Sequence, residues 1–78
     1  MDFRVELYVY RLGAEDTFRV RFAVSKFTGA GVQTYIVWPE DPFQEEQAAK
    51  ERGKELVETH MRDKHGLGPD AYTLGVVG

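Results

Sequence analysis

FRVELYVY at residues 3–10 and FRVRFAV at residues 18–24 alternate apolar side chains with other side chains along their whole lengths. A period of two is typical of strands that bury one face. The apolar positions are odd-numbered in the first stretch and even-numbered in the second, so both can point inward only if paired residue numbers sum to an odd value. A four-residue loop at Gly13–Asp16 supplies that sum and pairs Leu7 with Phe22. The two stretches therefore predict an antiparallel hairpin in this register.

The same register predicts aromatic and cationic pairs on the second face of the hairpin. Tyr8 is expected opposite Arg21, and Tyr10 is expected opposite Arg19. Neither pair belongs to the core, so this face stays open unless another element covers it.

A third strand is expected at about residues 32–38, after a turn at Gly29–Gly31 whose glycines supply positive-φ positions. Three apolar residues of this strand share the parity of the core: Val32, Ile36 and Trp38. Pairing Phe22 with Ile36 keeps both faces consistent. Tyr35 is then expected on the open face, beside the tyrosines and arginines of the hairpin.

A switch from strand to helix follows the third strand. Asp41 suits an N-cap, Pro42 suits the first helical position, and Gln44 completes a capping-box variant. Gly66 is a natural C-cap, so the helix is expected to span about Pro42 to His65.

One stripe of this helix is expected to face the sheet: Ala49, Gly53, Leu56, Val57, His60 and Met61. Two ion pairs are expected on its solvated side, Glu46 with Lys50 and Glu58 with Arg62. Gly53 costs a helix interior about 1 kcal/mol relative to Ala. Its place on the stripe favours a close approach of helix and sheet, and a break of the helix at Gly53 is the alternative.

After a loop at Gly66–Asp70, residues Ala71–Val77 read as a short fourth strand. It would run parallel to the first and third strands if it joins their sheet. The sequence thus predicts one α+β domain over residues 1–78. Its parts are an antiparallel three-stranded meander, one long helix packed on one face and a short fourth strand, in the order β-β-β-α-β.

Composition limits the class of protein. Hydrophobic residues make up 42% of the 78 residues and ten are aromatic, which excludes a disordered chain. No apolar run approaches the roughly 18 residues that a membrane span needs, so we expect a cytoplasmic protein without membrane contact. A domain this small without cysteine has no disulfide to stabilise it, which favours self-association.

Motifs for catalysis, cofactors or metals are not recognisable. The two G-x-G stretches, at Gly29 and Gly66, lack a third glycine and do not open a helix after a strand. His60 and His65 are five residues apart, which separates them by about 140° around a helix, whereas helical zinc pairs are three or four residues apart. We therefore expect a non-enzymatic protein with no cofactor and no metal site.

The open sheet face is the candidate binding surface, with five residues: Tyr8, Tyr10, Arg19, Arg21 and Tyr35. The leading hypothesis is an interaction domain that binds a protein partner or its own copy through this face or through a sheet edge. The alternative is nucleic-acid binding by the same face, with tyrosines stacking on bases and arginines on phosphates. A net charge of −3 weighs against that alternative. A third interpretation gives this face no binding role, because the arginines would lie across the tyrosines only to shield the sheet from water.

Overall fold

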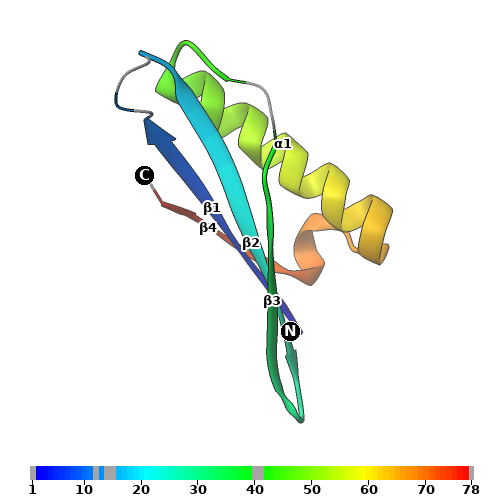
Figure 1. Ribbon diagram of the computed structural model, residues 1–78. Coiled ribbons are helices and arrows are strands. Elements are labelled where there is room, and N and C mark those ends of the chain that lie inside the picture. The colour runs from blue at the N-terminus through cyan, green and yellow to red at the C-terminus, as the bar shows by residue number, and fades with distance from the viewer. Residues whose placement is uncertain (1, 12, 14–15, 40–41, 78) are drawn as a thin grey trace.

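The computed structural model describes residues 2–11, 13, 16–39 and 42–77. A long helix lies across one face of the sheet (Figure 1). The elements are β1 (Phe3–Arg11), β2 (Phe18–Thr28), β3 (Gly31–Val37), α1 (Glu46–His65), a 3₁₀ turn η1 (Pro69–Ala71) and β4 (Thr73–Val77). The strand order in the sheet is β3-β2-β1-β4. The predicted α+β fold is confirmed. Among the described residues no helix combines the length and apolar character of a membrane span.

The β1–β2 hairpin has the predicted register. Leu7 pairs with Phe22 and Tyr8 pairs with Arg21, as the alternation required. Two residues of the predicted loop, Ala14 and Glu15, lie outside the described residues.

The fourth strand joins the sheet at its edge. β4 pairs in parallel with β1, with Val5 beside Leu74, so the sheet is mixed. Tyr72, immediately before β4, is buried in the core. A parallel neighbour was expected, because the helix returns the chain to the end from which β1 starts.

The predicted register of β3 is wrong by one residue. Phe22 pairs with Val37, not with Ile36, because the hairpin closes with a two-residue turn, Gly29–Ala30, between Thr28 and Gly31. Gly31 has φ +136°, a backbone angle that side-chain-bearing residues rarely adopt. A slip of one residue moves every side chain of a strand to the other face. The residues expected in the core at Val32, Ile36 and Trp38 are therefore exposed by 57%, 50% and 56%.

The core lies between α1 and the two central strands. It consists of alternate residues of β1 and β2 and the predicted stripe of the helix. Four residues of α1 are buried: Ala49, Gly53, Val57 and Met61. Of the predicted ion pairs, Glu46 with Lys50 is present at 3.3 Å, whereas Arg62 contacts Asp63 at 3.5 Å.

The helix begins later than the capping pattern predicted. Phe43 forms two backbone hydrogen bonds of 2.8 Å with Phe18, so the chain is still paired to β2 where the first turn was expected. α1 starts at Glu46, after an extended Glu45, and the predicted N-cap Asp41 lies outside the described residues. The C-terminal end is as predicted, with Gly66 at φ +67° and its N–H donating to the carbonyl of Arg62.

Gly53 marks the closest approach of helix and sheet. A Cβ atom at this position would lie 2.9 Å from Cδ2 of Leu7 and 3.0 Å from its Cδ1. Leu7 is fully buried, so its side chain has little freedom to move. The absence of a side chain at Gly53 therefore sets the distance between α1 and β1, and the helix continues through this residue.

We predict that Gly53→Ala lowers the free energy of unfolding by about 1 kcal/mol. Overpacking a core costs about 1–3 kcal/mol, which outweighs the gain in helix propensity of about 1 kcal/mol. In a Leu7→Val background both Cδ atoms are absent, so the same substitution should stabilise the protein by about 1 kcal/mol. Urea unfolding of the four proteins measures both effects. A stabilising Gly53→Ala in the otherwise unchanged chain would contradict the close approach.

Candidate functional site

The open face is the side of the sheet opposite α1, and the described elements leave it uncovered (Figure 1). The strand register places fifteen residues of the four strands on this face. They are Arg4, Glu6, Tyr8, Tyr10, Arg19, Arg21, Ala23, Ser25, Phe27, Val32, Thr34, Ile36, Thr73, Gly75 and Val77. Trp38, just beyond β3, joins them through its contact with Arg21. Four of the five predicted binding residues are thus on the open face.

Arg21 lies among three aromatic rings. Its guanidinium carbon is 5.1 Å from the ring centre of Tyr8, 5.5 Å from that of Tyr10 and 5.2 Å from that of Trp38. Each distance is within the range of a cation–π interaction, which stabilises exposed sites by about 0.5–1 kcal/mol. The sequence predicted the pairing of Arg21 with tyrosine, but Trp38 was assigned to the core. Arg21 therefore connects three aromatic side chains, from β1 and from the end of β3.

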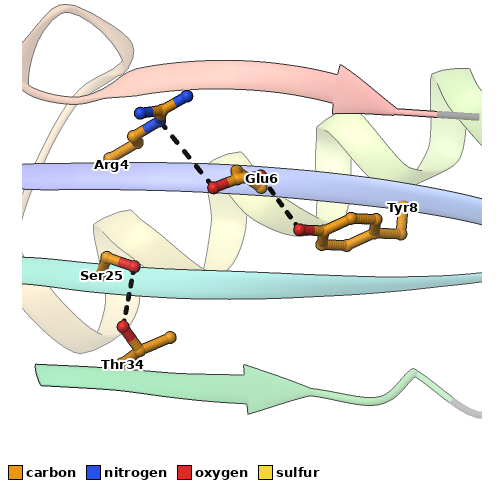
Figure 2. A network of polar contacts seen from close by, with 5 residues as sticks. All are labelled: Arg4, Glu6, Tyr8, Ser25 and Thr34. Carbon is orange, nitrogen blue, oxygen red and sulfur yellow. Dashed lines mark hydrogen bonds and ion pairs between the residues drawn. The ribbon is translucent and has the colours of Figure 1, made fainter.

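Polar contacts order the middle of the open face, as Figure 2 shows. The hydroxyl of Tyr8 donates to Glu6 at 3.0 Å, and Arg4 contacts the same carboxylate at 3.9 Å. The hydrogen bond to Glu6 raises the pKa of Tyr8. Ser25 and Thr34, opposite each other on β2 and β3, bond through their hydroxyls at 3.0 Å. The polar atoms that form these contacts are therefore paired with each other, although their side chains are on the open face.

Large apolar side chains gather on the open face along β3 and its turn. Phe27 and Val32 are directly opposite each other near the end of the hairpin and are exposed by 42% and 57%. Beyond the hydrogen-bonded pair of Ser25 and Thr34, Ile36 and Trp38 continue the row toward Arg21, and each is at least half exposed. Figure 1 shows this hairpin reaching past the rest of the sheet. Sequence reasoning missed this row, because a three-residue turn at Gly29 would have pointed three of these side chains inward.

Tyr35 is on the helix side of the sheet, so its predicted place on the open face is wrong. The shifted register pairs it with Val24, whose side chain is in the core. Its hydroxyl lies 2.8 Å from Nε2 of His60 and 2.7 Å from Nε2 of His65. A hydroxyl has one proton, so it can donate to one imidazole and accept from the other.

The two histidines converge although they are five residues apart. His65 is tilted against Phe3, with ring centres 4.8 Å apart, and His60 packs edge-on against Phe22 at 5.4 Å. The two imidazole centres are 6.0 Å apart. The angle of about 140° describes the directions in which the two side chains leave the helix backbone. It does not fix where their Nε2 atoms lie, and the hydroxyl of Tyr35 contacts both of these atoms from β3. The expectation that they diverge was therefore wrong.

Burial perturbs ionisation in this cluster of Tyr35, His60 and His65. Partial desolvation lowers the pKa of His60, and the charges of His65 and Lys64 lower it further, while Asp63 opposes them. Desolvation raises the pKa of Tyr35. The neutral forms of both groups are therefore favoured in the folded protein.

A shallow apolar groove of about 310 Å³ lies beside His60, where α1 passes the end of β3. Its lining residues are Phe22, Val37, Pro39, Leu56, Thr59 and His60. In the described part of the chain, His, Cys, Asp and Glu do not form any group of three placed to hold a metal ion.

Neither a scan against protein-family models nor searches of curated proteins and of solved structures returned a match for this chain. The function must therefore be inferred from the chemistry of its own surfaces.

We predict that acidification destabilises the protein through His60. The unfolded state binds a proton at an ordinary imidazole pKa of about 6.5, and the folded state binds it only at lower pH. The free energy of unfolding should therefore be constant above that value and fall as the pH drops through it toward the lowered pKa. Thermal unfolding between neutral pH and the carboxylate range measures this decline, and His60→Gln should reduce it. An equal decline in both proteins would contradict the assignment.

Proposed function

We propose that this protein is a non-enzymatic interaction domain whose open face binds a second copy of the same chain. The observation that carries the proposal is the row of exposed apolar side chains on a sheet face that the described elements leave uncovered: Phe27, Val32, Ile36 and Trp38. Contiguous exposed apolar patches on small proteins mark interaction sites. The same face carries the tyrosines and arginine that are enriched in protein interfaces.

A second copy suits the size of this surface. The Cα positions extend over 43 × 22 × 17 Å, so the broad side of the molecule matches the roughly 800 Å² that each partner buries in a standard interface. A chain of 78 residues buries a small core and has no cysteine with which to form a disulfide. Dimerisation would bury the apolar row and add stability that the monomer lacks.

The geometry supports packing of two open faces against each other. A two-fold axis brings the same patch of both copies together, so a surface that forms such an interface must complement itself. The open face carries both signs of charge, with Glu6 in contact with Arg4 and Arg21 opposite Tyr8, and exposed apolar side chains that can meet across the axis. Stacked sheets pack about 10 Å apart, which leaves the α1 helices on the outside of the dimer.

The contacts of two arginines and the net charge of the chain support a protein partner more than a nucleic acid. Arg4 contacts Glu6, and Arg21 is surrounded by aromatic rings. The chain carries a net charge of −3, whereas phosphate binding depends on a basic field. The test must therefore also distinguish self-association from nucleic-acid binding through Arg19 and Arg21.

We predict that Ile36→Glu weakens the dimer at least about tenfold, because burying an isoleucine side chain contributes roughly 1.5–3 kcal/mol and each copy loses it. Gln33→Glu is the matched control, since it places the same charge on β3 but on the helix side, opposite Lys26. Sedimentation over a wide concentration range measures the association. The fluorescence of Trp38, the single tryptophan, should shift to longer wavelength as the dimer dissociates.

Three other results of these measurements would contradict the proposal. A protein that stays monomeric at high concentration would contradict self-association. A monomer that binds a mixed oligonucleotide pool at low salt and releases it at high salt would favour the nucleic-acid alternative, and Arg21→Ala should then flatten the salt dependence. A dimer that tolerates Ile36→Glu would indicate pairing at a sheet edge.

A further inference from the structure

The cluster of Tyr35, His60 and His65 brings together three donor atoms of the kinds that bind metal ions. The hydroxyl oxygen of Tyr35 lies within 2.8 Å of both Nε2 atoms. The chain contains two histidines and no cysteine, so all of its imidazoles meet at one oxygen. This convergence comes from two elements distant in sequence, β3 and the end of α1.

Hydrogen bonds can account for both contacts of the Tyr35 hydroxyl only when the two imidazoles differ in tautomer. The tyrosine hydroxyl supplies one proton, so each neutral imidazole must adopt a different tautomer to bond with it. If the hydroxyl proton is released and the donating imidazole carries its proton on Nδ1 in place of Nε2, both Nε2 lone pairs and the phenolate oxygen become available to one cation. Metal–nitrogen distances of about 2.0–2.1 Å place tetrahedral donors about 3.3 Å apart, so each of the two oxygen–nitrogen distances needs to lengthen by about half an ångström.

We propose that His60, His65 and Tyr35 bind one divalent transition-metal ion through two imidazole nitrogens and one phenolate oxygen. Imidazole suits copper and zinc, and affinity for a given nitrogen and oxygen site is greatest for Cu²⁺ in the divalent series. Alkaline-earth ions prefer oxygen donors and should bind poorly. Three protein ligands leave at least one coordination position for water or a second ligand.

The surroundings of the cluster hold its ligands in place. Phe3 packs against His65 and Phe22 packs against His60, so each imidazole has an aromatic neighbour in addition to Tyr35. The side chain of Tyr35 is 37% exposed, which leaves an ion a path from solvent and room for water. The ammonium group of Lys64, 6.0 Å from the Tyr35 ring centre, opposes a cation. Replacing Lys64 with Gln should therefore tighten binding severalfold.

A bound ion would connect two elements that otherwise share few contacts. β3 extends beyond the part of the sheet that α1 covers, and its residues before Val37 are exposed. Coordination would join the C-terminal end of α1 to this edge strand. An ion that binds the folded chain and not the unfolded chain raises the unfolding temperature.

The test is titration of the metal-free protein with Zn²⁺ alone and with Cu²⁺ alone, by calorimetry. We expect one ion per chain, with Cu²⁺ tighter than Zn²⁺, and a raised unfolding temperature. Removing one ligand by His60→Gln, His65→Gln or Tyr35→Phe should weaken binding at least about tenfold, since even outer partners of metal ligands contribute tenfold or more. Tyr10→Phe is the matched control, because it removes a phenol from the opposite face.

Two further readouts identify the tyrosine as a ligand. Binding should release one proton per ion from the Tyr35 hydroxyl, measured by calorimetry in buffers of different ionisation enthalpy, and Tyr35→Phe should abolish that release. With Cu²⁺, a phenolate-to-copper absorption band should appear and be lost in the same variant.

Absence of one-to-one binding would overturn the proposal, as would equal affinity in Tyr35→Phe and the unchanged protein. Binding that survives loss of both histidines would assign the ion to surface carboxylates or the N-terminus. Unfolding curves recorded with a chelator show that each variant is folded. Because the cluster and the open face are on opposite sides of the sheet, Ile36→Glu should leave metal affinity unchanged.

Discussion

The two-residue turn at Gly29–Ala30 fixes which side chains of β3 meet the helix. It pairs Thr28 with Gly31, and the antiparallel ladder carries that register to the far end of the strand, where Phe22 pairs with Val37. Gly31 makes the turn possible with a φ of +136°. Because side chains alternate along a strand, one extra residue in the turn would exchange the two faces of β3 completely. Both candidate surfaces depend on this single constraint.

The core shows why β3 can present side chains on both sides. α1 packs over β1 and β2, where Gly53 lets it approach Leu7, and buried residues of these three elements form the core. β3 is at one edge of the sheet, and the hairpin that it forms with β2 reaches past the other strands (Figure 1). Its apolar residues on the open face remain exposed, while Tyr35 on the other side meets only the end of α1. An edge strand outside the core is thus the place where this small domain has surface for binding.

The two surfaces differ in chemistry. The open face combines apolar side chains with an arginine held by aromatic rings, a mixture that suits a protein partner. The opposite side gathers both histidines around one hydroxyl, a set of nitrogen and oxygen donors that suits a metal ion. The sheet separates them, so association and ion binding can each be changed without the other.

The sequence alone determined the β1–β2 register, the inward stripe of α1 and the end of the helix at Gly66, because strict periodicity and glycine chemistry act locally. At Gly53 it favoured a close approach of helix and sheet but left a break of the helix open. It also determined the open-face positions of Tyr8, Tyr10, Arg19 and Arg21. Only the tertiary structure decided the face of β3 and the start of α1. A glycine-rich turn is compatible with two loop lengths, and the pairing of Phe43 with Phe18 displaced a good capping pattern. The meeting of His60 and His65 likewise depends on Tyr35, which comes from a strand distant in sequence. The angle between two positions on a helix does not include such a contact.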